Sequence, residues 1–450
     1  MTVAFWTLDR VAAALGTGPG GQQPVRAVST DTRTISHGDV FVALEGETFD
    51  GHDHLAAAVE RGAVAVVASR VPRGEALGVP VYQVPDTLVA LGRLAAFWRN
   101  AWGKPVIAVA GSNGKTSTKD LLRAALGSRL AVHATAGSLN NRIGVPLTIL
   151  SIPRAADIAV VEVGTSLPGE VAILRDIARP DIALVTCVAE EHLEGLGDLA
   201  GVLREEAACY DGVEVGIAPA SQPEVVAEAR AGARSVVSAG LDEGDFRASA
   251  WRLAPDGLGE IDVAGVTVRS PLRGAHNLRN AMLALAAARS CGVTMEDAAR
   301  GIAAMPQPKM RTAWEQLGKA TVINDAYNSN PGSARAALDL IRAADGARQR
   351  VVVLGSMREL GAGSARCHAE IARLAVDSGA DVVAGIGEFA PALDGMSPVK
   401  ACVVTADDVE ALWPRLEPLL QADALILLKA SRGVRLERLL PYLTTWAEKC

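Results

Sequence analysis

The stretch Val106–Lys119 reads VIAVAGSNGKTSTK and decides how the chain around it folds. Its first five residues are an apolar run long enough for one buried parallel strand. The next four, GSNG at 111–114, form a turn, and KTST at 115–118 is the predicted first turn of a helix. A strand that enters a helix through glycines leaves unpaired backbone N–H groups directed at one point, where the helix dipole adds partial positive charge. The stretch therefore predicts a cradle for a triphosphate.

Two side chains of this motif suit phosphate chemistry. Lys115 would add a full positive charge, and Thr116 has a hydroxyl placed for a phosphate-bound magnesium ion. The outer glycine of the standard eight-residue P-loop would fall at Val109, so only the shorter G-x-x-G-K-T is present. The alternative is a glycine turn with an exposed lysine, and the order of strand, turn, Lys-Thr and helix argues against it.

The composition bounds the class of protein. A chain of 450 residues is long enough for about three domains, and 49% apolar residues supply several cores. The net charge of −7 argues against a nucleic-acid-binding surface, and 4% aromatic residues are too few for stacking platforms along a single strand. We therefore expect no nucleic-acid partner.

The cysteines and the apolar runs indicate the compartment. Six cysteines are scattered without a C-x-x-C pair, which is typical of a reducing compartment and not of a disulfide framework or a zinc site. The N-terminal MTVAFWTLDR lacks the basic start and the long apolar core of a signal peptide. No apolar run approaches the roughly 18 residues that a membrane helix needs. The expectation is a cytoplasmic protein without stable membrane insertion.

The order of expected strands and helices predicts an α/β protein of three domains. Residues 1–100 alternate short strands and helices and form a small domain. Residues 101–313 contain the motif GSNGKTS at 111–117, which we call the phosphate loop. They also contain a mainly parallel sheet, finished by short antiparallel strands. Residues 314–450 alternate strands and helices almost without interruption, which predicts a parallel sheet wound on both faces. This last domain lacks G-x-G-x-x-G after its first strand, so a dinucleotide site is not supported.

Two polar side chains lie near the carboxyl ends of expected strands in the domain of the phosphate loop. Glu162 lies near the end of the strand at 157–163, and His192 follows the strand at 182–188. Ligands bind at the carboxyl ends of parallel strands, and an acid in an apolar strand is costly unless it is paired or binds metal. We favour a magnesium ligand over a buried ion pair for Glu162. For His192, a metal ligand and a structural histidine remain equally open, because magnesium prefers oxygen.

Three further polar clusters can be interpreted from their spacing. Asn277 and Asn280 share one face of an expected helix, where they either bind a purine edge or cap the helix. Asn330 is expected to cap a helix that begins at Pro331. Thr-Asp-Thr-Arg at 30–33 is interpreted as a helix cap with a surface ion pair.

Nine motifs together carry a family resemblance over essentially the whole chain. They are STDTRTISHGDVFVAL, FDGHDHLAAAVERGA, GSNGKTS, SLNNRIGVPLTIL, EHLEGLG, GAHNLRN, NDAYNSNPGS, VVVLGSMRELG and LLKASRG, in this order. Their order resembles that of the Mur ligases, which build the peptide stem of peptidoglycan. Each motif alone would be weak, but the combination is highly specific.

The resemblance implies an ATP-dependent ligase that joins D-alanyl-D-alanine to UDP-N-acetylmuramoyl-tripeptide through an acyl phosphate. Residues 1–100 would bind the UDP-sugar, 101–313 would bind ATP, and 314–450 would bring the incoming amino component in a Rossmann-like fold. ATP and Mg²⁺ are the implied cofactors. Both peptide substrates are small molecules, and we expect a monomer.

The resemblance assigns roles to residues that match its motifs. The phosphates and first magnesium would be held by Gly111, Ser112, Asn113, Gly114, Lys115, Thr116 and Ser117. The adenine would be contacted by His276, Asn277 and Asn280, and Arg311 and Asp325 would close on the nucleotide from across the domain boundary. Metal binding is assigned to Thr116, Glu162, His192 and Glu206, and catalysis to Lys115, Glu162 and His192. The UDP portion would be contacted by Asp31, Thr32 and Arg33, and the substrate path would be lined by Asn140 and Asn141. The D-Ala-D-Ala site would lie near Tyr327, Asn328, Asn330 and Ser431. The alternative for Asn330 and Ser431 is that they only start or cap helices.

The chain departs from the family pattern at two places. Gly355-Ser356-Met357 stands where the pattern usually reads G-D-M, so one acid near the cleft is missing. Glu206 stands fourteen positions after His192, where the family usually has a lysine whose carbamate binds a second magnesium. Glutamate preserves the charge and the ligand type on a stem that is roughly 3–4 Å shorter. It would bind the metal through a water, or its helix would lie closer, or Glu190 and Glu191 would share the role; otherwise Glu206 is a solvated helix residue.

Three other functions compete with this interpretation. The first is another carboxylate–amine ligase of the superfamily, such as a sibling Mur ligase or folylpolyglutamate synthase; the DGHD and YNSNP stretches argue against it. The second is a P-loop motor or switch on a macromolecule, which the acidic charge argues against. The third is an inactive binding protein of this fold, which the intact Lys115, Thr116 and Glu162 argue against.

Overall fold

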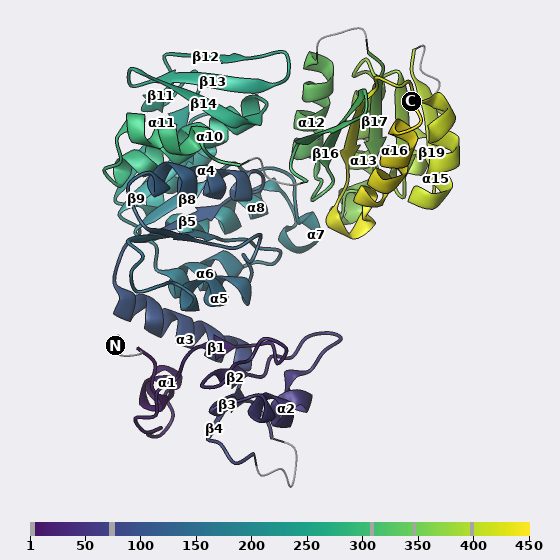
Figure 1. The fold of residues 1–450 in the computed structure, drawn as a ribbon. Helices are drawn as coiled ribbons and strands as arrows, with labels where there is room; N and C mark the ends of the chain where they lie inside the picture. Colours follow the sequence, from purple (N-terminus) through teal and green to yellow (C-terminus); the bar gives the residue numbers. More distant parts are fainter. Residues whose placement is uncertain (1–4, 72–76, 307–309, 345–347, 397–399) are drawn as a thin grey trace. The chain divides into compact units, whose positions relative to one another are not determined.

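The computed structural model describes residues 5–71, 77–306, 310–344, 348–396 and 400–450. Its contacts divide the chain into two compact units. The first unit contains the residues up to 108, 131–164 and 172–181, and the second contains 109–130, 165–171 and 182–450. Each unit has its own strands and helices (Figure 1). Among the described residues, no helix combines the length and the apolar character needed to cross a membrane.

A parallel four-stranded sheet forms the N-terminal part of the first unit. Its strands pair in the order β1 (Val28–Ser29), β2 (Val40–Val42), β3 (Ala65–Ala68) and β4 (Val81–Gln83). Helix α1 (Leu8–Leu15) begins where the Thr7 hydroxyl accepts from Arg10 N and ends at Gly16, with a φ of 72°. The core beside this sheet contains Phe41 of β2, Val66 of β3 and Leu55, which begins α2 (Leu55–Glu60). The α/β character expected for this region is confirmed.

The remainder of the first unit contains two further parallel strands and two helices. β6 (Val132–Ala134) pairs with β7 (Ile158–Glu162), and α3 (Thr87–Trp102) and α5 (Gly144–Leu150) belong to the same unit. The Asp86 side chain caps α3 by accepting from Val89 N. β5 (Val106–Ala110) and α6 (Glu170–Ala178) are divided between the two units. All five residues of β5 are buried, as expected of an interior parallel strand.

The second unit begins at Val109, within β5, and continues through the glycine turn into the next helix. Four of its strands pair in parallel in the order β8 (Ile182–Val185), β9 (Val215–Pro219), β10 (Ser235–Gly240) and β11 (Phe246–Arg247). The helices here are α4 (Lys115–Gly127), α7 (Leu193–Leu196), α8 (Leu199–Ala207), α9 (Pro223–Gly232), α10 (Ala275–Ser290) and α11 (Met295–Ala303). The expected antiparallel strands are confirmed as β12 (Ala250–Leu253), β13 (Leu258–Val263) and β14 (Val266–Arg273).

The strand expected at 182–188 ends three residues early, at Val185. The backbone that follows it has other partners. The Cys187 carbonyl accepts from Ser112 N in the phosphate loop at 2.8 Å, and Val188 N donates to the Gln222 side chain at 2.8 Å. The phosphate loop therefore replaces a neighbouring strand as the partner of this segment.

The C-terminal sheet has six strands. They pair in the order β15 (Ala313–Leu317), β16 (Ala320–Asp325), β20 (Leu425–Lys429), β17 (Arg350–Leu354), β18 (Val382–Ile386) and β19 (Cys402–Ala406), and all pairs except β15–β16 are parallel.

Alternate residues of β17 face two different cores. Val351 and Val353 pack with α15 (Val409–Leu416) and α16 (Leu439–Ala447), whereas Val352 and Leu354 pack with α12 (Pro331–Ala343), α13 (Ser364–Val376) and α14 (Phe389–Leu393). The doubly wound sheet that the sequence predicts is confirmed (Figure 1).

Candidate active site

The phosphate loop has a backbone conformation that requires glycine at two positions. Gly111 (φ 114°) and Gly114 (φ 81°) both lie in the left-handed region. A Cβ on Gly111 would lie 2.3 Å from Thr186 Oγ1, and a Cβ on Gly114 would lie 2.6 Å from Asn280 Nδ2. Side chains from α10 and from the residue that follows β8 thus close on the loop backbone and leave room only for glycine. The order of strand, turn and helix expected from the motif is confirmed.

Lys115 folds back across the loop from the first turn of α4. Its Nζ donates to the Gly111 carbonyl and lies 3.4 Å from the Ser112 carbonyl. Nζ also pairs with Glu191 at 3.6 Å, and the two side chains are 13% and 5% exposed. The lysine charge therefore lies inside the loop, at the point where phosphate groups are expected.

Adjacent glutamates of α8 face two different segments. Glu205 accepts from Gly169 N at 2.7 Å and Val171 N at 2.8 Å, so it holds the start of α6. Glu206 is fully buried, and its Oε2 accepts from Gly111 N at 2.7 Å. Within the described part of the chain, Oε1 of Glu206 has no hydrogen-bond partner. The alternative that Glu206 is a solvated helix residue is wrong, because α8 buries this face against the phosphate loop.

Burial dominates the electrostatics of this cluster. It raises the pKa of Glu206 to about 7, an effect that Lys115 opposes and Glu191 reinforces. Burial also raises the pKa of Glu191, and the positive charge of Lys115 again opposes this effect. Burial raises the pKa of the Cys187 thiol to about 11, so the thiol is no nucleophile at neutral pH. Two buried carboxylates beside one lysine favour the binding of a further cation.

His192 precedes α7 with a φ of 50°, which is uncommon for a residue with a Cβ. Its Nδ1 bonds to the Glu359 carboxylate, and its Nε2 lies 3.9 Å from Glu191 Oε2. Burial lowers the pKa of His192, but the Glu359 hydrogen bond and the Glu191 charge outweigh burial and raise it overall. His192 thus lies between two carboxylates, one of which pairs with Lys115.

The start of α10 provides a hydrogen-bonded set of neutral groups. Asn280 Nδ2 donates to Asn277 Oδ1 at 3.1 Å, and Asn277 Nδ2 donates to the Arg273 carbonyl at 2.9 Å. Asn277 Nδ2 also lies 3.1 Å from His276 Nε2. Burial lowers the pKa of His276 to about 4, so its ring is neutral at pH 7. Neutral polar groups suit a purine edge, and the adenine role of these residues stays a prediction.

Asp325 ends β16 beside a buried lysine that sequence reasoning missed. Asp325 Oδ1 accepts from Thr312 N at 3.0 Å, and its Oδ2 pairs with Lys429 Nζ at 3.0 Å. Lys429 also donates to the Asn328 carbonyl, and its side chain is 2% exposed. The sequence contains a signal for this pair, because a lysine ends the apolar strand β20. Lysine is almost never buried unless it is paired.

The residues expected near D-Ala-D-Ala lie in the loops that follow β16 and β20. Arg311 lies over the Tyr327 ring, 4.3 Å from its centroid. Ser431 Oγ donates to the Ser329 carbonyl at 3.2 Å and accepts from Arg358 N at 3.0 Å. The alternative that Ser431 only caps a helix is wrong, because its hydroxyl joins two other loops.

Asn330 contacts two different elements. Its Oδ1 accepts from Ser333 N at 2.9 Å, and Ser333 Oγ accepts from Asn330 N at 3.1 Å, which completes a capping box on α12. Its Nδ2 donates to Asn113 Oδ1 at 2.8 Å and lies 3.5 Å from Glu191 Oε2. The expected helix cap is confirmed, and the same side chain joins α12 to the phosphate loop.

Replacing Asn330 by aspartate is expected to separate these two contacts. Aspartate keeps an acceptor for Ser333 N, but it cannot donate to Asn113 and it adds a negative charge near Glu191. We expect the KM for ATP to rise about tenfold, which corresponds to about 1.4 kcal/mol, with a small loss of thermal stability. Steady-state kinetics and thermal unfolding measure the two effects.

Asp408→Ala is the matched control for this substitution. Asp408 caps α15 by accepting from Ala411 N at 2.8 Å. Its loss should cost about 1 kcal/mol of stability and leave the KM for ATP unchanged. An Asn330→Asp variant with the wild-type KM would show that the contact with the phosphate loop has no role in nucleotide binding.

Glu162 and its neighbours belong to the first unit. Glu162 is 1% exposed, and its Oε1 accepts from Asn140 Nδ2 at 2.9 Å. Thr135 Oγ1 accepts from Glu162 N at 2.9 Å. Asn141 Oδ1 accepts from Gly144 N at 2.9 Å in the first turn of α5. The Asn140 amide reduces the cost of burying the acid, and the metal and substrate roles of these residues stay predictions.

Asp31 and Arg33 form an ion pair at 2.7 Å, in which the Arg33 side chain is 83% exposed. Hydrogen bonds from Arg33 lower the pKa of Asp31 to about 2. The Thr32 carbonyl accepts from Arg61 at 2.8 Å. The surface ion pair is confirmed, but the helix cap is wrong: Thr34 N bonds to the Asp31 carbonyl, and the chain turns toward β2. The UDP role of these residues stays a prediction.

The FDGHD motif at 49–53 is held by a buried histidine. His52 Nδ1 bonds to Asp50 Oδ1 at 2.6 Å, and its Nε2 accepts from Ser69 N at 3.0 Å. Arg70 contacts Asp50 and pairs with Glu45 at 3.0 Å. Ligand atoms of Glu45, Asp50 and His52 lie within 4.8 Å of one another. Because Arg70 balances the carboxylates and both ring nitrogens are bonded, we assign a structural role to this cluster.

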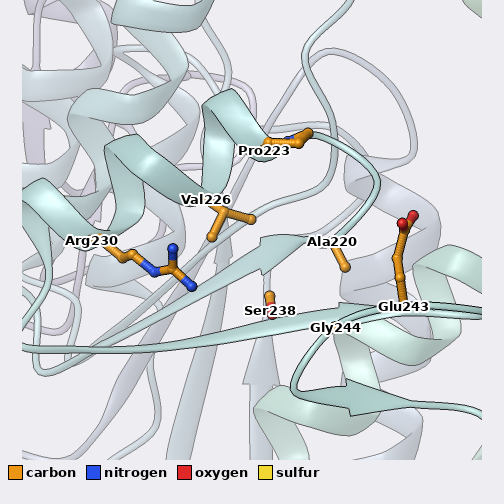
Figure 2. A pocket seen from close by; sticks show the side chains of 7 residues that line it. All are labelled: Ala220, Pro223, Val226, Arg230, Ser238, Glu243 and Gly244. Carbon is orange, nitrogen blue, oxygen red and sulfur yellow. The ribbon is translucent and has the colours of Figure 1, made fainter.

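A pocket of about 210 Å³ lies beside α9, β9 and β10, within the second unit (Figure 2). Its lining residues are Ala220, Pro223, Val226, Arg230, Ser238, Glu243 and Gly244. None of the residues expected to bind ATP, metal or substrate lines it. The candidate active site therefore stays at the phosphate loop.

Three family models match the chain. The Mur ligase family catalytic domain matches residues 24–99, the Mur ligase middle domain matches 109–288, and the Mur ligase glutamate ligase domain matches 310–432. This chain belongs to the Mur ligase family. The family expected from the motifs is confirmed.

Full-length relatives and solved structures agree with this assignment. The UDP-N-acetylmuramoyl-tripeptide–D-alanyl-D-alanine ligase of Escherichia coli strain K12 is 36% identical over 430 residues, which cover 93% of each chain. A crystal structure of MurF from Acinetobacter baumannii has a TM-score of 0.89 at 30% identity and covers 98% of this chain and 99% of its own. MurF ligase from Thermotoga maritima in complex with ADP has a TM-score of 0.83 at 26% identity and covers 94% and 98%. The three-domain α/β architecture of the Mur ligases is thus confirmed.

The position where the Mur ligase pattern usually has aspartate is used structurally in this chain. Ser356 Oγ accepts from Glu388 N at 2.9 Å, and the Ser356 carbonyl accepts from Ser431 N at 3.2 Å. The serine therefore ties the end of β17 to the segments that follow β18 and β20. In this Mur ligase the missing acid is replaced by a neutral link between loops.

Proposed function

We propose that this Mur ligase joins D-alanyl-D-alanine to UDP-N-acetylmuramoyl-tripeptide with ATP, giving the UDP-muramoyl-pentapeptide precursor of peptidoglycan. The observation that carries the proposal is the phosphate loop, where Lys115 lies 3.6 Å from Glu191 and Glu206 accepts from Gly111. A full-length relative named for this reaction supports the two substrates. ADP in the similar Thermotoga maritima enzyme supports ATP as the nucleotide.

The proposed chemistry has two steps. The γ-phosphoryl group of ATP passes to the C-terminal carboxylate of the tripeptide, which forms ADP and an acyl phosphate. The amine of D-Ala-D-Ala then attacks the acyl carbon, the C–N bond forms, and phosphate leaves from a tetrahedral intermediate. Phosphoryl transfer needs charge neutralisation and alignment more than covalent catalysis. Lys115, the loop N–H groups and the start of α4 supply positive charge for this purpose.

Mg²⁺ is part of the proposal, and the donor set at the loop fits it. Glu206 has a buried carboxylate oxygen without a hydrogen-bond partner among the described residues, and Thr116 lies in the first turn of α4. Oxygen donors of this kind suit magnesium. Bound magnesium supplies neutralising charge to the phosphate oxygens. Glu162 and His192 are the further proposed ligands, and Lys115, Glu162 and His192 are the proposed catalytic residues.

Each of the three domains would bind a different substrate. We propose that residues 1–100 bind the UDP portion, 101–313 bind ATP, and 314–450 bind D-Ala-D-Ala. The roles assigned above to the adenine-contacting and substrate-contacting residues are part of this proposal. We also propose that the protein is a monomer and that it acts in the cytoplasm.

An assay of phosphate release from ATP tests the function. Release should require UDP-muramoyl-tripeptide and D-Ala-D-Ala together, and mass spectrometry should find the pentapeptide product. Tripeptides that end in diaminopimelate and in lysine should be compared, because the choice between them is open. Release with a folate and glutamate, or with a single amino acid in place of D-Ala-D-Ala, would support folylpolyglutamate synthase or a sibling Mur ligase instead.

A further inference from the structure

Glu359 contacts the segment of His192 through its side chain and its backbone. Its carboxylate bonds to His192 Nδ1, and its carbonyl accepts from Glu194 N at 3.4 Å. Two residues later, a Cβ on Gly361 would lie 3.2 Å from the Glu194 Cα, so this backbone packs directly on α7. The segment that follows β17 is therefore docked on the segment that follows β8.

Both members of the His192–Glu359 pair have a left-handed backbone, with φ values of 50° and 64°. For residues with a Cβ this conformation is energetically unfavourable. Such strain persists where the surrounding structure holds it, and it often marks a functional constraint. Here the two strained residues are bonded to each other.

The segment that carries Glu359 is also fixed by contacts with other parts of the C-terminal region. Met357 N donates to His368 Nε2 at 2.9 Å, and Arg358 N donates to Ser431 Oγ at 3.0 Å. His368 is 1% exposed and Ser431 is 3% exposed, so both anchors are buried. The backbone of Glu359 is therefore held in place independently of its contact with His192.

The contact at Nδ1 determines what the other ring nitrogen can do. A carboxylate at Nδ1 keeps a proton there, which leaves the lone pair of the neutral ring on Nε2. That nitrogen lies 3.9 Å from Glu191, which in turn pairs with Lys115 of the phosphate loop. Histidines that bind metals commonly donate their other N–H to a carboxylate, which fixes the tautomer and raises the basicity of the ligand.

We propose that Glu359 is a positioning residue, which fixes the Nδ1–H tautomer of His192 and presents Nε2 to the divalent cation that accompanies the nucleotide. This inference rests on the proposed function for the presence of a nucleotide-bound cation. Glu359 follows a strand of the C-terminal sheet, whereas His192 follows β8. The cation site is therefore complete only when these two segments are docked.

Nitrogen NMR of the wild-type protein tests the tautomer directly. In long-range proton–nitrogen spectra of protein labelled with ¹⁵N-histidine at pH 8.5, His192 should carry its proton on Nδ1. Addition of Mg²⁺ and the β,γ-methylene analogue of ATP should then shift the Nε2 resonance. A His192 ring with its proton on Nε2 would overturn the proposal. Because this experiment uses only the wild-type protein, it does not depend on whether a variant folds.

Metal affinity provides the second test. Electron paramagnetic resonance of free Mn²⁺, in the presence of the same ATP analogue, should show binding weakened 10–100-fold in Glu359→Ala. Glu359→Gln retains a carbonyl acceptor for Nδ1–H and should recover part of this loss. Glu370→Ala is the matched control, because Glu370 is a partly exposed glutamate of the same sheet domain that pairs with Arg335.

The outcomes separate this proposal from the proposed function. Wild-type Mn²⁺ affinity in a folded Glu359→Ala protein would refute the positioning role, even if the wild-type enzyme makes the pentapeptide. The expected tautomer and a weakened Mn²⁺ affinity, in a protein that does not ligate D-Ala-D-Ala, would refute only the proposed substrates.

Discussion

Replacing Lys115 by alanine is expected to reduce ATP-dependent phosphate release at least about 1,000-fold while the protein stays folded. The lysine charge lies inside the phosphate loop, where it would act on the phosphoryl group during transfer. Its loss leaves Glu191 without the nearby cation at 3.6 Å. Because burial already raises the pKa of Glu191, this carboxyl can take up a proton, which limits the cost to stability. The measurements are kcat at saturating ATP and the thermal unfolding midpoint.

Lys104→Ala is a suitable control for the loss of a lysine. Lys104 donates to the Ala156 carbonyl at 2.6 Å and lies 3.6 Å from Asp157, so it also makes a backbone contact and an ion pair. This substitution should leave kcat unchanged. A Lys115→Ala enzyme that retains the wild-type kcat would show that the loop is not the site of phosphoryl transfer.

Replacing Glu206 by glutamine is expected to have the second-largest effect on activity. Glutamine can still accept from Gly111 N, but it removes the carboxylate that we propose as a magnesium ligand. We expect kcat to fall roughly 100-fold, because even the loss of a residue that only supports a metal ligand commonly costs 10–100-fold. A Glu206→Gln enzyme with full activity and an unchanged magnesium dependence would refute the metal role.

The same substitution is expected to stabilise the protein when nucleotide and magnesium are absent. Burial raises the folded-state pKa of Glu206 from 4.5 to about 7, so the folded state binds more protons than the unfolded state between these pH values. Stability therefore falls as the pH rises from about 4.5 to about 7, by up to roughly 3 kcal/mol. Glutamine does not titrate, so Glu206→Gln should unfold at a higher temperature than the wild type at pH 8, and the difference should vanish near pH 4.

Bicarbonate provides a separate test of Glu206. A lysine at this position would need carbon dioxide to become a carboxylate, whereas glutamate already is one. We expect activity to be unaffected when bicarbonate is removed from the buffer. Activity that falls without bicarbonate and returns when it is added would contradict the proposed replacement of a carbamate by Glu206.

Local spacing in the sequence was sufficient for much of this protein. The phosphate loop was predictable because a five-residue apolar run, two glycines and Lys-Thr together specify a strand, a turn and a helix within fourteen residues. The cap of α12 was predictable because the capping contact of Asn330 reaches only as far as Ser333, within the first turn of the helix. The doubly wound C-terminal sheet followed from the alternation of strands and helices, since parallel strands need crossover helices.

Only the tertiary structure decided which side chains meet across long separations. Glu205 and Glu206 are adjacent and chemically identical, yet packing of α8 directs one to the start of α6 and the other to the phosphate loop. The bond between His192 and Glu359 joins residues 167 positions apart, and the cap of α12 reaches Asn113 across 217. Capping and glycine turns depend on neighbours within a few residues, so the sequence specifies them. Contacts between segments depend on how several helices and strands pack, and no short pattern in the chain records that geometry.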